Sequence, residues 1–360
     1  MVKGNVGEWS EFYVFLKLLA DKKLVAADSD LNKITATSYS IVEIIRRETS
    51  GEMKYEFIEG NKIKITHVGA ETITVEGGDL AAKAKEILEF IEKDKDESAF
   101  AVPGAAELMY RLHTNRLSAS GGGKADLYLK VHDATAQSDF EIGFSIKSML
   151  GAASTLLNAS AATNFIYPIT GLDREKADVI NAIDTRSKIK DRLAAISEKG
   201  GVIGEPKAES ETFEKNLRKI EAILPGIVGK LVLDYYSGAG SSVKELVENL
   251  GSSEIDLFGF ELSIDDYIFK IKNFLYDIAL GLKPSELWDG LIRAHGGYII
   301  VRKDGEVVAY HAENADQLKT YLFENTKLET PSSSRHGFGE IYEENGAFFI
   351  KLNLQIRFLR

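Results

Sequence analysis

Apolar residues recur every three or four positions in several segments of the chain. The first such segment, residues 7–24, carries this spacing through GEWSEFYVFLKLLADKKL and predicts an amphipathic helix. The same criterion predicts further helical segments at residues 77–98, 103–113, 173–199, 211–224, 263–282 and 313–325. Residues 237–250 predict one more helix, with Ser241 or Ser242 as its N-cap and Glu245 near the capping-box position.

Alternating apolar and polar residues predict β-hairpins in four places. These are residues 62–78, 126–147, 296–311 and 337–358, and the last two turn at Asp-Gly and Asn-Gly pairs. Residues 148–171 predict a helix that leads into a buried strand at Asn164–Ile169, and residues 326–337 predict a loop. Helices and hairpins in this order are typical of the α+β class.

The hairpin DLYLKVHDATAQSDFEIGFSIK, residues 126–147, brings chemistry-bearing residues to one end. With its turn near Ala136, antiparallel pairing places Asp126 opposite Ile146 and diagonal to both Ser145 and Lys147. Alternation along the second strand leaves one wholly apolar face, which is predicted to be buried and consists of Phe140, Ile142, Phe144 and Ile146.

A carboxylate beside a lysine suits phosphodiester hydrolysis. The Asp126 carboxylate is a ligand for Mg²⁺, a hard cation that prefers oxygen donors. A bound metal ion acidifies a water molecule and neutralises charge that builds up on phosphate. The Lys147 ammonium group is a candidate for orienting that water or for stabilising the pentavalent phosphate.

Composition and charge narrow the choice of function classes. The chain has 360 residues, a net charge of −11 and no cysteine, which excludes disulfides, thiolate metal ligands and a cysteine nucleophile. No apolar run is long enough to cross a bilayer, and the first residues lack a secretory signal, so we expect a cytoplasmic protein of a prokaryote. The acidic balance argues weakly against nucleic acid, because a basic cleft is compatible with an acidic exterior.

Several longer stretches resemble a known family. GEWSEFYVFLKLLADKKLVAADSDLNK, GGGKADLYLK, GFSIKSMLGAASTLLNASAATNFIY and SSSRHGFGEIYEENGAFFIKLNLQIRF together look like the HpaII type II restriction endonucleases, which belong to the PD-(D/E)xK nuclease superfamily. The resemblance runs over nearly the whole chain. It implies that Asp126 is the first acid of the motif and Lys147 its lysine. Ser145 departs from the motif, because a serine cannot supply the second carboxylate.

A carboxylate from elsewhere is needed to replace the one missing at Ser145. Glu11 and Glu8 lie three residues apart on the first predicted helix, and nucleases of this superfamily often complete the metal site from that helix. Glu11 is preferred because its apolar neighbours place it near the core boundary, and Glu107 is a weaker candidate. The hypothesis is therefore a Mg²⁺ site held by Asp126 and Glu11, with Lys147 and Ser145 beside it.

The resemblance also implies the organisation of the chain. We expect a PD-(D/E)xK-like mixed sheet flanked by helices, with additional helical and C-terminal αβ DNA-recognition elements. The predicted division is a nuclease core at 1–175, a mainly helical region at 176–290 and a recognition region at 291–360, with the alternative of one compact domain.

Reading a DNA sequence requires side chains that reach base edges, and arginine suits guanine. Arg335 and His336, in a serine-rich segment, are the leading candidates for this role. The remaining candidates for DNA contacts are Lys327, Lys351, Arg357, Ser148, Asn158 and Asn164, of which Asn158 and Asn164 are equally good helix-capping residues.

The family resemblance further implies the partners and the target. It implies Mg²⁺-dependent cleavage of double-stranded DNA, with CCGG or a related tetranucleotide as target, and pairing with a cognate DNA methyltransferase. A palindromic site is most simply cut by a homodimer. Three alternatives stay open: an inactive DNA-binding protein on a nuclease scaffold, which Ser145 favours; a structure- or modification-dependent nuclease; and a protein without nucleic acid, which only the acidic charge favours.

Overall fold

The computed structural model describes residues 2–49, 51–67, 72–119, 125–133, 138–251, 262–310, 315–332 and 335–359. The chain forms two compact units, and each is built from separate segments of the sequence. Unit 1 is built from residues 1–154 and 292–321, and unit 2 from residues 155–291 and 322–359. The chain leaves unit 1 after residue 154 and returns to it at residue 292, so the predicted boundary at 290 lies close to a boundary between the units and the one at 175 lies within unit 2.

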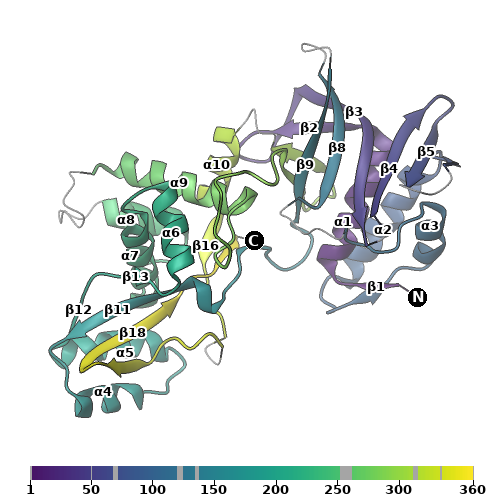
Figure 1. The fold of residues 1–360 in the computed structure, drawn as a ribbon. Coiled ribbons are helices and arrows are strands. Elements are labelled where there is room, and N and C mark those ends of the chain that lie inside the picture. The colour runs from purple at the N-terminus through teal and green to yellow at the C-terminus, as the bar shows by residue number, and fades with distance from the viewer. Residues whose placement is uncertain are drawn as a thin grey trace. The chain divides into compact units, whose positions relative to one another are not determined.

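Unit 1 contains a mixed nine-stranded sheet with the order β2-β15-β14-β9-β8-β3-β4-β5-β6 (Figure 1). Its strands are β2 (Lys23–Ala27), β3 (Lys33–Glu48), β4 (Gly51–Ile58), β5 (Lys62–His67), β6 (Ile73–Glu76), β8 (Leu127–Asp133), β9 (Ser138–Ser148), β14 (Gly297–Val301) and β15 (Val307–Tyr310). A separate pair joins β1 (Lys3–Gly4) to β7 (Phe100–Ala101). The α+β class predicted from the sequence is confirmed by this mixture of strands and helices.

Long-range pairing decides how this sheet is assembled. The long strand β3 pairs with β2 near its start and with β8 and β4 nearer its end. The hairpin of β14 and β15 is confirmed, but it adds to the sheet of unit 1, where β14 runs parallel to β9. The segment 292–321 thus belongs to the same sheet as the predicted catalytic hairpin.

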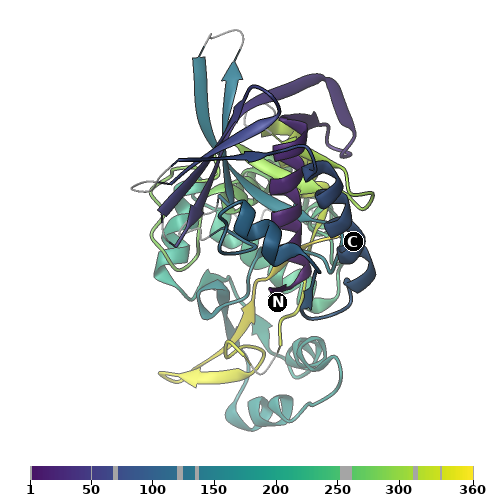
Figure 2. The same ribbon diagram turned by 90° about the vertical axis from the view of Figure 1, so that its right-hand side faces the viewer.

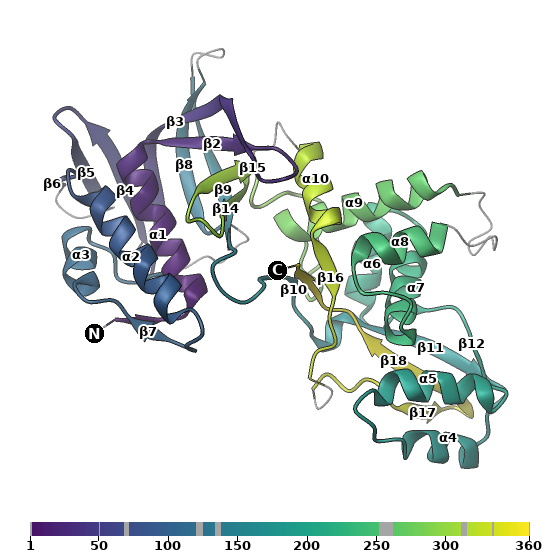
Figure 3. The same ribbon diagram turned by 180° about the vertical axis from the view of Figure 1, so that it is seen from behind.

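One face of the sheet is covered by helices of unit 1. The helices here are α1 (Val6–Asp21), α2 (Leu80–Asp94) and α3 (Ala105–Arg111), while α10 (Ala315–Glu324) begins in unit 1 and ends in unit 2. Figures 2 and 3 show α1 and α2 lying side by side. The helix α1 begins with a capping box, in which Asn5 and Glu8 exchange hydrogen bonds of 2.9 and 3.0 Å. This assigns Glu8 a capping role.

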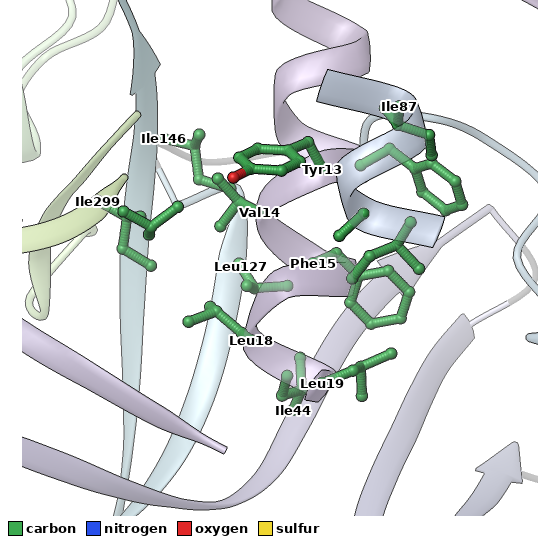
Figure 4. Packing of buried hydrophobic residues seen from close by; sticks show 14 of the residues in the cluster. Tyr13, Val14, Phe15, Leu18, Leu19, Ile44, Ile87, Leu127, Ile146 and Ile299 are labelled. Carbon is green, nitrogen blue, oxygen red and sulfur yellow. The ribbon is translucent and has the colours of Figure 1, made fainter. Parts of the chain in front are cut away.

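The core of unit 1 lies between α1 and the sheet. Figure 4 shows Val14 and Leu18 of α1 facing Leu127 of β8 and Ile146 of β9. The predicted burial of Ile142, Phe144 and Ile146 is confirmed, although the residues between them are buried too. Phe140 is 44% exposed because the hairpin extends beyond the helix that covers its base. Burial of these apolar side chains fixes the face of the hairpin that points away from the core.

Unit 2 combines helices with two small sheets. Its helices are α4 (Arg174–Asn181), α5 (Lys188–Glu198), α6 (Glu211–Ile220), α7 (Leu224–Ser237), α8 (Val243–Gly251) and α9 (Ile264–Leu280), with a 3₁₀ turn at Ala161–Thr163. Its strands are β10 (Thr155–Leu157), β11 (Asn164–Thr170), β12 (Val202–Ile203), β13 (Lys207–Ala208), β16 (Thr326–Leu328), β17 (Ile341–Glu344), β18 (Ala347–Asn353) and β19 (Ile356–Phe358). Helices α6, α7 and α8 lie close together (Figure 3).

Several local predictions in unit 2 need correction. The helix predicted after residue 148 is instead irregular chain followed by β10, although the strand that follows it, β11, is confirmed. The predicted loop at 326–337 begins with strand β16, which pairs with β19. The N-cap of α8 is Ser242, whose Oγ accepts a hydrogen bond of 3.2 Å from the Glu245 amide. None of the helices among the described residues could span a membrane.

Candidate active site

Asp126 lies just before β8 and is clamped to β9. Its amide donates a hydrogen bond of 2.7 Å to the carbonyl of Phe144. Its carboxylate Oδ2 accepts two hydrogen bonds, one of 2.7 Å from the Ile146 amide and one of 3.1 Å from Ser145 Oγ. The carboxylate is therefore held against the middle of the second strand of the hairpin.

The register of the hairpin differs by one residue from the predicted one. Leu127 pairs with Phe144, so Asp126 falls opposite Ser145, whereas Ile146 was expected there. The predicted turn residue, Ala136, lies outside the described residues. The one-residue shift moves Asp126 onto the same face as Ser145 and Lys147, since residues directly opposite each other share a face.

Ser145 replaces the expected second acid with a hydrogen-bond donor. It is buried, and its hydroxyl donates to Asp126 Oδ2. A second carboxylate at this position would face Asp126 with a like charge at a similar distance. Serine instead donates a hydrogen bond to the Asp126 carboxylate and fixes its orientation.

Glu11 lies on α1, half-buried, within electrostatic range of the hairpin residues. Burial and, after it, the Asp126 carboxylate raise the pKa of Glu11 to about 8, while Arg46 and Lys147 oppose this shift. These couplings place Glu11 with Asp126 and Lys147 in one cluster. A carboxyl group with such a raised pKa is typical of functional sites.

Lys147 lies on the same face of the sheet as Asp126 and Ser145. Its Nζ lies 5.6 Å from the ring centroid of Tyr298, a buried residue of β14 that pairs with Ser145. A cation over an aromatic face is stabilised by the ring quadrupole. Because Lys147 also lowers the pKa of Glu11, its ammonium group is near both the aromatic ring and the carboxylates.

A serine pair joins α1 to β9 beside these residues. Ser10 Oγ lies 2.8 Å from Ser148 Oγ, and Ser10 is fully buried next to Glu11 in the sequence. Ser148 was predicted to contact DNA, but here its hydroxyl links the strand that carries Lys147 to the helix that carries Glu11. The sequence signal for this link was a small polar residue on the apolar face of a predicted helix.

Arg46 is a second neighbour that the sequence analysis missed. It is buried on β3, where its Nη2 donates hydrogen bonds of 2.9 and 3.1 Å to the carbonyls of Arg116 and Leu117. Its guanidinium carbon lies 4.7 Å from the ring centroid of Phe15, one helical turn after Glu11. Strand β3 was not predicted, because its apolar run IVEIIRRE lacks regular alternation.

The donor set of this cluster suits a hard divalent cation. Asp126 and Glu11 supply carboxylate oxygens, and their mutual repulsion is the kind of electrostatic cost that a bound cation removes. Among the described residues there is no group of three or more His, Asp or Glu side chains placed to hold a metal ion. A two-carboxylate site completed by water or by a substrate oxygen remains compatible with Mg²⁺, which keeps several waters when it binds.

The leading candidates for DNA recognition lie in unit 2, whereas the cluster of Asp126, Glu11 and Lys147 belongs to unit 1. Arg335 is exposed, and its amide donates a hydrogen bond of 3.0 Å to the carbonyl of Ser332. His336 has a left-handed backbone, with φ of 69°. Its carbonyl accepts a hydrogen bond of 2.8 Å from Asn164 Nδ2, which anchors the segment to β11.

Most of the other predicted DNA contacts are engaged within unit 2. Asn164 is buried and bonds to Glu209, His336 and Asn353, so it is a structural residue and not an available DNA contact. The cations pair with carboxylates of the same unit, Lys351 with Glu209, and Arg357 and Lys327 with Glu329. Asn158 is exposed and lies in an irregular segment after β10.

Comparisons with known proteins agree on one family. The model of the HpaII restriction endonuclease family matches residues 5–358. The chain is 39% identical over 358 residues to the type II restriction enzyme HpaII of Haemophilus parainfluenzae, which covers 99% of this chain and 98% of that protein. No solved structure matches the chain.

Proposed function

Because the chain belongs to the HpaII restriction endonuclease family and is therefore a site-specific deoxyribonuclease, we propose that Asp126, Glu11 and Lys147 form its catalytic centre. In this proposal unit 1 is a PD-(D/E)xK-like nuclease core that hydrolyses phosphodiester bonds of double-stranded DNA with Mg²⁺. The observation that carries the proposal is the clustering of Asp126, Glu11 and Lys147, with the Asp126 carboxylate clamped by Ser145 and Ile146.

Type II restriction endonucleases generally use a divalent metal ion. Held by Asp126 and Glu11, such an ion would polarise the scissile phosphate and lower the pKa of a bound water. Ser145 holds the Asp126 carboxylate in place through its hydrogen bond. Lys147 provides a positive charge for the attacking water or for the phosphate oxygens as their charge increases.

We assign CCGG as the target, on the strength of the family resemblance along the whole chain. In this assignment Arg335 donates to the O6 and N7 atoms of guanine, which one guanidinium can reach together. A palindrome of four base pairs is read by two copies of the chain, each using one half-site. A cognate methyltransferase would protect the host DNA in the prokaryotic cytoplasm.

Digestion of a DNA of known sequence tests the proposal. With Mg²⁺ we expect discrete fragments whose sequenced ends all lie at CCGG, and no cleavage after chelation. Ends at a different sequence would disprove the target, and smeared products would indicate a nuclease without sequence preference.

The alternative favoured by Ser145 is a DNA-binding protein without catalysis. It predicts intact DNA whose mobility is retarded in a gel, with any divalent cation supplied. Prior methylation of the substrate tests the remaining alternative, a modification-dependent nuclease, which would cut only the methylated DNA.

A further inference from the structure

A row of side chains crosses the sheet of unit 1 at the level of the proposed catalytic centre. Asp126 falls opposite Ser145 on one side. On its other side lies β3, which pairs with β8 through Ile45 and Tyr128. Continuing that antiparallel pairing by two residues places Arg47 opposite Asp126 and on the same face, about 5 Å away along the row. Glu52 of β4 follows, paired with Arg47.

Arg47 is held in place by three contacts. Its guanidinium carbon lies 3.9 Å from the ring centroid of Tyr128, and its Nη1 donates a hydrogen bond of 2.6 Å to the Tyr128 hydroxyl. Its Nε donates a hydrogen bond of 3.1 Å to Glu52. The side chain nevertheless remains 43% exposed. A planar guanidinium that is stacked and bonded in this way loses less conformational entropy when it binds a further anion.

The sequence of β9 makes room for this arrangement. Tyr128 pairs with Gly143, and a Cβ atom at Gly143 would lie 2.8 Å from Tyr128 Cε1 and 2.9 Å from Ala125 Cβ. Any larger residue would therefore push the Tyr128 ring from its place beneath Arg47. The ring and the guanidinium together form a platform two residue pairs away from Asp126 and Ser145.

An exposed arginine in an ion pair is ordinarily a solvated surface charge. The same sheet offers such a residue for comparison. Lys64 of β5 pairs with Glu56 at 2.8 Å and is 42% exposed, but it lies on an outer strand away from the catalytic row. Arg47 differs from Lys64 in its position beside Asp126 and in its stacking on Tyr128, and these two features need an explanation beyond solvation.

We propose that Arg47, supported by Tyr128, binds a phosphate of the DNA backbone next to the bond that is cut. A guanidinium matches the geometry of two phosphate oxygens, and Arg47 shares the sheet face that carries Asp126 and Lys147. This contact would hold the DNA in register with the proposed metal site. The inference rests on the proposed function, since it assumes that DNA lies over Asp126.

The test measures binding of the full chain to a fluorescent duplex that contains CCGG, in chelator and over a series of salt concentrations. Arg47→Ala should weaken binding about 5- to 10-fold and reduce the slope of log affinity against log salt by about 1, as expected for one lost phosphate contact. Arg47→Lys should keep the slope and lose part of the affinity. Lys64→Ala, the matched control, should leave both within about 2-fold of the wild type.

The proposal is overturned if Arg47→Ala binds with the wild-type affinity and slope, or if Lys64→Ala weakens binding equally, which would indicate a general field effect. Thermal unfolding of each variant reports whether the fold is retained, and Arg47→Lys keeps the test decisive if Arg47→Ala unfolds. Failure of the proposed function would appear differently, as a wild-type chain that leaves DNA uncut in Mg²⁺.

Discussion

The predicted site residues of the two units differ in the charges that lie beside them. In unit 1 the carboxylates of Asp126 and Glu11 lie in one cluster, and burial together with that repulsion raises the pKa of Glu11 to about 8. In unit 2 the predicted DNA-contacting cations are neutralised, since Lys351 pairs with Glu209 and Arg357 with Glu329. The arginine of the second pair lowers the pKa of Glu329 below its usual value.

This difference distinguishes charged residues with a proposed role in catalysis from charged residues that stabilise the fold. Carboxylates that lie close together at a cost to stability indicate a site that binds a cation. Ion pairs between opposite charges instead indicate residues that stabilise the fold. By this criterion the cluster in unit 1 is the stronger candidate for chemistry. The recognition hypothesis for unit 2 therefore rests on Arg335 and its neighbours, because using the paired lysines and arginines would require breaking their ion pairs.

The largest expected effect tests the unit 1 cluster directly. Asp126→Ala should lower the single-turnover cleavage rate by about 10³-fold or more, because it removes a proposed metal ligand whose carboxylate also bonds to Ser145 and Ile146. Asp139→Ala, an exposed acid of the same hairpin that bonds to His132, is the control and should cut normally. Cleavage by Asp126→Ala near the wild-type rate would remove the metal site from this position.

Lys147→Ala should slow cleavage by about 10²- to 10³-fold, with DNA affinity changed little, since its charge acts on the reacting phosphate. Lys130→Ala removes a lysine from the same hairpin that pairs with Asp139, and it should have little effect. The measurement is single-turnover cleavage at saturating DNA. Equal rates for the two variants would show that Lys147 is an ordinary surface charge.

Glu11 should make cleavage depend on pH. Its raised pKa means that, without a metal ion, the Glu11 carboxyl group is largely protonated below about pH 8. At a limiting Mg²⁺ concentration the cleavage rate should therefore rise with pH up to about 8, and Mg²⁺ binding measured by calorimetry should release a proton. A flat profile between pH 6 and pH 8.5 in both measurements would contradict this assignment.

The same pKa shift makes a prediction about stability. In the metal-free folded chain Glu11 retains its proton between its ordinary pKa of 4.5 and about 8, so its favourable contribution is full below 4.5 and is lost as pH rises to about 8. Glu11→Gln cannot lose a proton. It should therefore be more stable than the wild type above pH 8, on the order of 2 kcal/mol by denaturant unfolding, while cutting about 10²-fold more slowly.

A smaller effect is expected from the recognition candidates of unit 2. Arg335→Ala should reduce discrimination between CCGG and a site with one altered guanine by about 1–3 kcal/mol, the worth of one bidentate contact. Lys351→Ala should change discrimination less, because its partner Glu209 already holds it. Competition binding with matched duplexes gives both ratios, and the opposite order would reassign the reading residue to Lys351.

The local sequence predicts some elements of this architecture and misses others. The helix α1, the hairpin of β8 and β9, and the hairpin that turns at Asn345 and Gly346 follow from local periodicity and turn chemistry, and all three are confirmed. The helix expected after residue 148 was wrong, and β3 and α7 were not predicted. Those segments are decided by distant partners, and such contacts leave no regular spacing in the local sequence.

The sequence by itself determined that an acid and a lysine would stand at the base of one hairpin, because antiparallel pairing about the turn brings the outer ends of the two strands together. Only the tertiary structure decided the register that pairs Asp126 with Ser145, the approach of Glu11 from α1, and the return of residues 292–321 to the same sheet. These depend on packing between segments that are far apart in the chain. Burial of the apolar faces selects one such arrangement, and the charges of the site are then held where that packing puts them.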